Sequence, residues 1–267
     1  MSAVLGRKKD DFTEDSTSAK EQYTSFEGAK SGRQALMDTD SPNGGGPSGA
    51  MKQIMLDKDN CITFFGRKDF LSNFYDSPML IAGHSYPTVE HYYEACKVYA
   101  IAGPYHAMYL KEAQAPGHVK SMVKRIVNEC GIPKRHIERW KRSDGLYVMR
   151  VGLMEKYRQN ASLREQLLKT GESLLVQTNQ YDNLWSVGMD ETEYRDWLAE
   201  HHGNPFQYPA LIEPHSIDRI PDLAKGKNLL GFLTMYVRDL LRKEFGQDGR
   251  VEALKSGDLD AGDMEMN

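Results

Sequence analysis

The chain has 267 residues, of which 40% are hydrophobic, and a formal net charge of −4. The hydrophobic content is sufficient for a packed core, whereas the acidic balance lacks the basic field that supplies most sequence-independent affinity for nucleic acid. A dedicated DNA-binding module is therefore disfavoured. No run of about 18 apolar residues and no secretory stretch occurs, so we expect a cytoplasmic or nuclear protein without a membrane partner.

Polar segments flank the part of the chain that can fold. Residues 1–50 are rich in Ser, Thr, Asp, Lys and Gly, and residues 246–267 are polar and acidic. Such segments bury too little apolar surface to offset the entropy of an ordered chain, so we expect two disordered tails. Residues 51–245 are expected to form one compact domain.

The folded part is expected to begin with short strands and a helix. Residues 61–65 are β-branched and aromatic, which is typical of a strand, and residues 79–81 predict a second strand with Gly83 in the turn that follows. Thr88 then suits the N-cap of a helix, and apolar residues recur at helical spacing beyond it. We expect an amphipathic helix over residues 88–102.

Helices dominate the rest of the domain, so the expected fold class is α+β and predominantly helical, with a few short strands. Residues 190–224 place His, Pro and Gly in irregular order around a short amphipathic piece, and we expect them to form a surface insertion. Further helices are predicted at about 104–113, 118–130, 134–157 (interrupted near 143–145), from a Ser162 cap to Gly171, and at 228–245, and a strand at 174–177.

The sequence favours neither a metal site nor a cofactor. Cys61, Cys96 and Cys130 are far apart and odd in number, which predicts buried apolar residues rather than ligands or disulfides. His201 and His202 are adjacent, and no H-E-x-x-H pairing occurs. Because Walker A and G-x-G-x-x-G loops are also lacking, we expect no bound metal and no cofactor.

The helix that begins near Thr88 carries charged groups two turns apart. Glu90 and Lys97 are seven residues apart and share nearly one face, with Glu94 between them. This face offers a carboxylate and an amine for chemistry. The alternative is a solvated stripe in which Glu94 pairs with Lys97 for a few tenths of a kcal/mol.

A loop after the first strand combines polar groups with aromatic faces. Gly66 opens it, and Ser72 and Asn73 offer side-chain hydrogen bonds beside Phe74. Directional polar groups beside a stacking surface suit a nucleobase or a ribose. The alternative is an ordinary Asx or Ser turn.

Four other features are candidates for the same site. Trp140 and Trp185 could each stack a planar ring, although such residues are more often part of a core. Asp182 follows the predicted strand at 174–177, where a loop can hold a functional group or simply turn. Lys227 and Asn228 open the last helix, whose dipole, N–H groups and lysine could hold a phosphate.

In chain order these motifs resemble the NADAR superfamily, and within it the YbiA-like N-glycosidases. The resemblance spans about residues 61–245. The motifs that carry it are Gly66 with Leu71-Ser72-Asn73-Phe74, Pro87-Thr88-x-Glu90-His91-Tyr92 with Lys97, Trp140, Asp182-x-x-Trp185 and Gly226-Lys227-Asn228-x-Leu230-Gly231.

The resemblance implies hydrolysis of the C–N bond between ribose 5-phosphate and a base-like amine, as in early riboflavin-pathway intermediates. It also implies an alternative, removal of ADP-ribose from guanine or another acceptor, with ADP-ribosylated nucleic acid as the partner. The same resemblance makes Glu90, Lys97, Trp140 and Asp182 the functional set.

More than one mechanism is open. Glu90, with Asp182 as its partner, could stabilise positive charge on the ribose and activate water. Trp140 would then stack on the leaving base, and Lys227 with the amides near Asn228 would hold phosphate. Lys97 could instead capture the opened sugar as a Schiff base. The alternatives from other classes are a non-catalytic ADP-ribose or nucleotide-binding module and a scaffold that acts through its tails.

Overall fold

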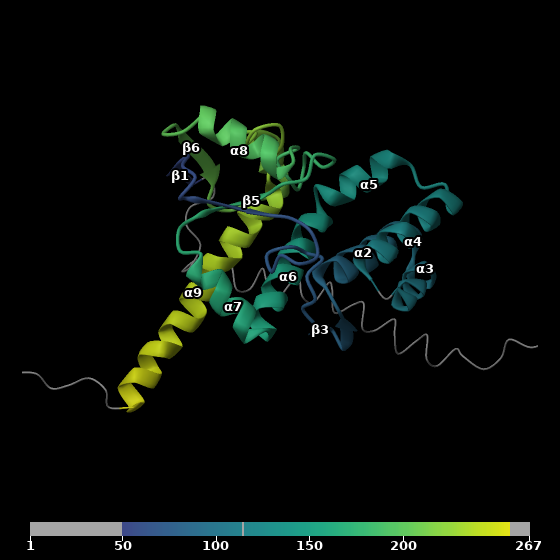
Figure 1. The fold of residues 1–267 in the computed structure, drawn as a ribbon. Coiled ribbons are helices and arrows are strands. Elements are labelled where there is room, and N and C mark those ends of the chain that lie inside the picture. The colour runs from purple at the N-terminus through teal and green to yellow at the C-terminus, as the bar shows by residue number, and fades with distance from the viewer. Residues whose placement is uncertain (1–49, 114, 257–267) are drawn as a thin grey trace, which may run out of the picture.

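The computed structural model describes residues 50–113 and 115–256 as a predominantly helical α+β fold, as the sequence predicts (Figure 1). The strands are β1 (Met51–Met55), β2 (Cys61–Phe64), β3 (Met79–Ile81), β4 (His84–Tyr86), β5 (Leu174–Gln177) and β6 (Pro205–Pro209). The α-helices are α2 (Val89–Ala102), α3 (Pro104–Met108), α4 (Pro116–Glu129), α5 (Lys134–Lys141), α6 (Asp144–Gln159), α7 (Ala161–Lys169), α8 (Glu191–Glu200) and α9 (Leu229–Ser256), with 3-10 turns η1 (Tyr109–Glu112) and η2 (Pro214–Arg219).

The strands pair in three two-stranded sheets. β2 and β5 pair in parallel, β3 and β4 form the predicted hairpin around Gly83, and β1 pairs antiparallel with β6. The β1–β6 pair is not predicted from the sequence, because each strand is short and β6 is bounded by prolines. Their ladder, with Met51 opposite Pro209, forms only when the chain brings the two segments together.

Helices α6 and α9 join two sides of the molecule. Figure 1 shows α2, α4 and α5 on one side, and α8 with β1, β5 and β6 on the other. Helix α6 contacts α2 and α9, and α9 in turn contacts β5. A candidate site between α2 and β5 is therefore held by elements that are packed on both sides.

Helix α2 has the predicted boundaries but not the predicted amphipathic character. The Thr88 side chain accepts a hydrogen bond from the His91 amide, and Gly103, at a φ of 91°, ends the helix. All residues from Val89 to Val98 are buried, including the charged ones. The alternative interpretation, a solvated charged face, is wrong, because α3, α4 and α6 all pack against this helix.

Two predicted breaks in the helical region behave differently. The interruption near residues 143–145 is confirmed, since α5 ends at Lys141 and α6 begins at Asp144. The Ser162 cap is wrong: α7 begins at Ala161 after Asn160. Gly171, at a φ of 57°, follows the end of α7 as predicted.

The last helix corrects the expected start of the C-terminal tail. Helix α9 continues to Ser256, so the tail expected from residue 246 is helical over its first residues. The expected tail at residues 1–49, and its counterpart at 257–267, lie outside the described residues.

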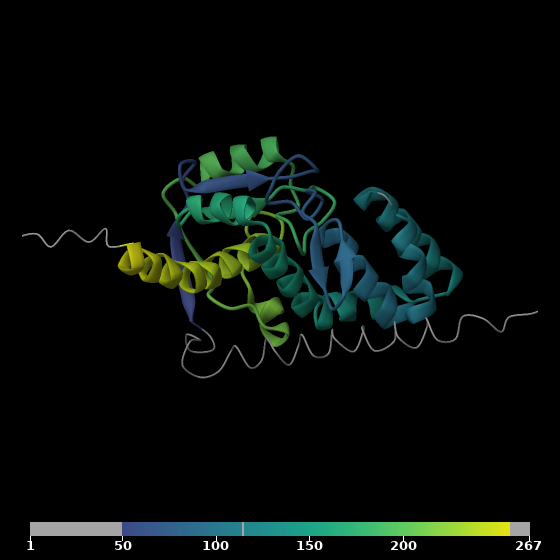
Figure 2. The same cartoon turned by 90° about the horizontal axis from the view of Figure 1, so that it is seen from below.

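Residues 190–224 are not a surface addition. Tyr194, Ile217 and Leu223 are almost completely buried in the main core. Figure 1 shows α8 close to β5, and Figure 2 shows α8 (green) beside the blue strand β2, with which it encloses a cavity. The apolar residues of this segment follow no single period, because His, Pro and Gly interrupt them in irregular order. The sequence therefore did not predict their burial.

All three cysteines are free; Cys96 is buried as expected, whereas Cys61 and Cys130 are only half-buried. No helix in the described part of the chain is long and apolar enough to cross a membrane.

Gly231, in the first turn of α9, lies against the backbone of β5. A Cβ atom added there would meet the Leu175 carbonyl oxygen at 2.1 Å and the Asn228 amide at 2.5 Å. We expect Gly231→Ala to lower the free energy of unfolding by about 1–3 kcal/mol or more, because overpacking forces backbone to move. Urea unfolding measures this, and Gly246→Ala, which meets nothing within 4 Å in the same helix, is the control. Equal stability of the two variants would contradict the close approach.

Candidate active site

A cavity of about 430 Å³ lies between α2, the loop after β2 and the loop after β5. It brings together eight residues singled out from the sequence, and it leaves out Trp140, Lys227 and Asn228. The eight residues are Gly66, Ser72, Asn73, Phe74, Glu90, Lys97, Asp182 and Trp185.

The charged face of α2 forms one wall of this cavity. Glu90, Glu94 and Lys97 are only 5%, 4% and 8% exposed. Burying a charge is costly unless it is paired, so this face cannot be the solvated stripe of the alternative interpretation. The three groups are held away from bulk water beside a space that a ligand can enter.

Each carboxylate of α2 has a lysine partner. Lys97 Nζ donates a hydrogen bond to Glu94 Oε1 at 2.6 Å. Lys120, which reaches in from α4 with a half-exposed side chain, lies 3.1 Å from Glu90 Oε1. Lys120 Nζ also lies 4.7 Å from the centre of the Phe74 ring. The wall is thus nearly neutral overall while it retains two carboxylates and two amines.

Burial raises the pKa of Glu90, although Lys120 opposes this shift. Burial lowers the pKa of Lys120, but the attraction of Glu90 outweighs it, and the net direction is upward. A carboxyl group with a raised pKa retains its proton closer to neutral pH and can donate it to a leaving group.

The loop that carries Ser72 and Asn73 is both a turn and a wall of the cavity. Ser72 Oγ accepts a hydrogen bond from the Phe74 amide, as the turn interpretation predicts. The Asn73 carbonyl accepts the Glu90 amide at 3.1 Å, which ties this loop to the start of α2. The Asn73 side chain donates from Nδ2 to the Met149 sulfur.

Asp182 also combines two roles. Its Oδ1 accepts hydrogen bonds from the Leu184 and Trp185 amides at 3.0 and 2.9 Å, so it closes a turn. The same side chain lines the cavity opposite α2. The turn therefore holds a carboxylate rigidly at the edge of the site.

Three buried polar atoms of uncharged cavity residues have no hydrogen-bond partner among the described residues. They are Asn73 Oδ1, the Tyr93 hydroxyl and Gln177 Oε1. A buried polar group without a partner costs about 1–3 kcal/mol. Such atoms are typical of a wall that completes its hydrogen bonds with a ligand.

Trp140 lies behind the cavity rather than in it. Its ring centroid is 5.1 Å from that of Tyr93, and Tyr93 in turn meets Trp185 edge to face at 5.8 Å. The stacking of Trp140 on the leaving base stays a prediction, and in this structure the ring packs against Tyr93. Its role is to support Tyr93, which lines the cavity.

The side chains predicted to hold a phosphate at the start of α9 are engaged within the protein. Asn228 is fully buried and joins α9 to β5, since its side chain accepts from the Gln177 amide and donates to the Leu175 carbonyl. Lys227 Nζ binds the Ile220 carbonyl and lies 3.0 Å from Asp222.

The amides at the start of α9 are also occupied. Those of residues 227–230 donate to carbonyls of the loop after β5, in residues 183–186. These four amides therefore anchor the loop after β5 and are not available to an anion.

Several residues of the cavity were not found from the sequence as site residues. Glu94 and Tyr93 could have been predicted as site residues, because they lie about one helical turn from Glu90 on α2. Lys120, Lys141 and Tyr181 come from α4, α5 and the loop after β5. No local pattern marks these three, since only packing brings α4 and α5 beside α2.

No group of three or more His, Cys, Asp and Glu side chains in residues 50–113 and 115–256 could hold a metal ion. The polar side chains that line the cavity carry carboxyl groups, amines, amides and hydroxyl groups.

The NADAR domain family matches residues 57–242, which is most of the chain and includes every wall of this cavity. The chain belongs to the NADAR family.

Individual relatives are more distant. The N-glycosidase YbiA of Shigella flexneri is 27% identical over 190 residues, which cover 70% of this chain and 92% of that protein. A riboflavin biosynthesis protein of Vibrio vulnificus is 30% identical over 125 residues, 45% of this chain and 30% of that protein. This chain therefore matches under a third of the Vibrio protein's length. The solution structure of Escherichia coli YbiA, 23% identical, aligns with a TM-score of 0.47 over 72% of this chain and 91% of that chain.

A buried lysine supports the Ser72 loop from below. Lys156 is completely buried, donates to the Ser72 carbonyl at 2.8 Å and faces the rings of Tyr75 and Tyr157. Burial lowers its pKa to about 7, and Asp69 only partly offsets this. The unfolded chain therefore binds more protons than the folded chain between about pH 7 and pH 10.5, so this lysine makes stability rise with pH in that window.

We expect Lys156→Met to remove this contribution to the pH dependence. The free energy of unfolding is measured with urea at about pH 7 and about pH 9. Between these two pH values it should gain less for Lys156→Met than for the unmodified chain. Lys124→Met, at an exposed position of α4, is the control and should keep the original gain. An unchanged gain in Lys156→Met would show that the buried amine is not the source.

Proposed function

We propose that the chain is an N-glycosidase, which hydrolyses the C–N bond between a phosphorylated ribose and a base-like amine. The observation that carries the proposal is the buried carboxyl wall of α2 in a cavity that also holds Asp182. Membership of the NADAR family supports it, as do relatives that are named N-glycosidases.

The reaction needs a proton donor and a stabilised sugar cation. As the C–N bond breaks, positive charge develops on the ribose, and a nearby carboxylate stabilises it. Glu90, with its raised pKa, gives its proton to the departing nitrogen. Asp182 directs a water molecule to the anomeric carbon and accepts a proton from it. The products are the free sugar phosphate and the amine.

The lysines of the rim replace the phosphate site first expected at Lys227. Lys120 and Lys141 line the cavity from α4 and α5. Among the described residues, Lys141 forms an ion pair with Glu138 alone, at 2.9 Å, and the Glu138 side chain is about half exposed. Exposed pairs contribute little, so a substrate phosphate can replace Glu138.

Two substrate classes fit this cavity. Ribosylated aminopyrimidines of the riboflavin pathway are the first, and the name of the Vibrio relative supports this class. The second is an ADP-ribosyl group on guanine, free or in nucleic acid. Phe65 and Tyr181 favour it, since these cavity residues are 60% and 89% exposed and can stack a second ring.

A direct assay tests the proposal. Ribosylaminouracil phosphate and ADP-ribosylated guanosine are incubated with the protein, and released base and sugar are measured by mass spectrometry. We expect Glu90→Gln to reduce the rate about 10²- to 10⁴-fold, because it cannot transfer the proton. Glu129→Gln, an exposed position on α4, is the control. Undiminished product release by Glu90→Gln would refute the assignment, and binding without release would identify a non-catalytic reader.

Lys97 has a separate test. Its amine is bound to Glu94, and this pair must open before the amine can attack the C1 aldehyde of the opened sugar. We therefore expect borohydride treatment during turnover to leave no ribosyl adduct on Lys97 in peptide mapping. A reduced adduct there would establish the Schiff-base route and contradict direct attack by water.

A further inference from the structure

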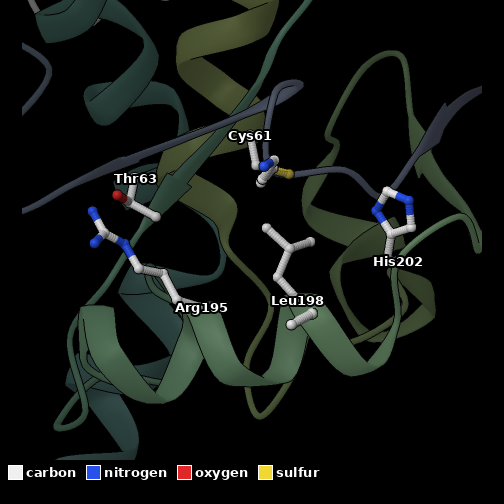
Figure 3. A pocket seen from close by; sticks show the side chains of 7 residues that line it. Cys61, Thr63, Arg195, Leu198 and His202 are labelled. Carbon is white, nitrogen blue, oxygen red and sulfur yellow. The ribbon is translucent and has the colours of Figure 1, made fainter.

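A second and larger cavity, of about 660 Å³, lies between β2 and α8 (Figure 3). The residues around it are Lys58, Cys61, Thr63, Arg195, Leu198, Ala199 and His202. This set shares no residue with the catalytic cavity. The volume is within the range of sites for small molecules, about 300–1,000 Å³.

The two walls of this cavity face each other. Figure 3 shows Cys61 and Thr63 on the strand pointing toward Leu198 and Arg195 on the helix, with His202 on the loop beyond. Arg195 lies at the Thr63 end, and the sulfur of Cys61 points to the His202 side. The space is therefore elongated along α8, with different groups at its two ends.

The charged residues around the cavity are all basic, although the chain as a whole is acidic. Lys58 forms no ion pair with another described residue. Arg195 pairs with Glu191 at 2.5 Å, but both side chains are more than half exposed. An exposed pair contributes about 0.2–1 kcal/mol, so an incoming oxyanion can replace Glu191.

Thr63 supports the Arg195 end as the anion position. Its hydroxyl now donates to Glu191 Oε1 at 3.1 Å and can donate to the same oxyanion. The opposite end is less suitable, since α8 ends at Glu200 and carries the negative end of its dipole there. Asp57 lies 3.9 Å from His202 at that end as well.

The middle of the cavity is apolar and has no aromatic platform. Leu198, Ala199 and Cys61 form it, and His202 at one end is the sole ring among the residues around it. A nucleobase or another flat ring would lack a stacking surface. An aliphatic chain needs none, because its burial is non-directional.

We propose that the β2–α8 cavity is a second ligand site, which takes an aliphatic monocarboxylate. The carboxylate is bound by Arg195 and Thr63, and the chain lies along Leu198 and Ala199 toward Cys61. The site stands independently of the N-glycosidase activity.

Cys61 reports occupancy directly. Decanoate is the probe, and the full chain is alkylated with iodoacetamide. The reaction is run at about pH 9, because burial raises the pKa of the Cys61 thiol and only the thiolate reacts. At about ten times its dissociation constant, decanoate should slow the labelling of Cys61 about tenfold. Cys130, which is also half-buried but lies elsewhere, should label at an unchanged rate.

Matched probes and variants decide between specific binding and general adsorption. Decyltrimethylammonium, with the same chain and the opposite charge, should not protect Cys61. Arg195→Gln should raise the dissociation constant of decanoate about tenfold or more, and Ala199→Trp should abolish protection by filling the cavity. Ala161→Trp, at another exposed helical alanine, should leave protection intact.

Three results would overturn the proposal. They are an unchanged Cys61 rate in decanoate, equal protection by the two probes, and equal protection of Cys130. None of them bears on product release in the glycosidase assay, so the two proposals succeed or fail separately.

Discussion

The burial of charge on α2 is the constraint on which the site depends. A helix that buries Glu90, Glu94 and Lys97 needs partners for these charged groups. Lys97 pairs with Glu94 on the helix itself, and Lys120 comes from α4 to meet Glu90. The position of α4 is therefore part of the chemistry of the cavity, since it compensates the carboxylate whose pKa burial raises.

Polar residues behind the cavity hold its walls in place. Asn228 connects α9 to β5 through two buried hydrogen bonds, and Lys156 supports the Ser72 carbonyl. Replacing either would leave buried backbone groups unpaired, which costs more than the bond itself contributes. The family motif around Asn228 and Gly231 is thus explained by the tight contact of α9 with β5 rather than by phosphate binding.

Strand β2 serves both cavities. Its Cys61 and Thr63 side chains face α8, and Phe65 and Gly66, directly after the strand, line the candidate active-site cavity. The loop that carries Asp182 and Trp185 similarly leads into α8. Two sites with opposite chemical character, one with paired carboxylates and amines and one basic and apolar, are therefore built on the same short parallel sheet.

Local sequence determined much of the helical framework and one wall of the site. The Thr88 cap, the end of α2 at Gly103 and the break between α5 and α6 depend on residues close in the chain, so their signals survive without tertiary contacts. The spacing of Glu90 and Lys97 likewise places both on α2. Tertiary structure alone decided whether this face meets water or a cavity, because burial depends on α3, α4 and α6. Tertiary structure also brought Lys120 to Glu90, and it placed Trp140 against Tyr93 and Asn228 between α9 and β5. Side chains from distant segments share no local pattern that would predict these contacts.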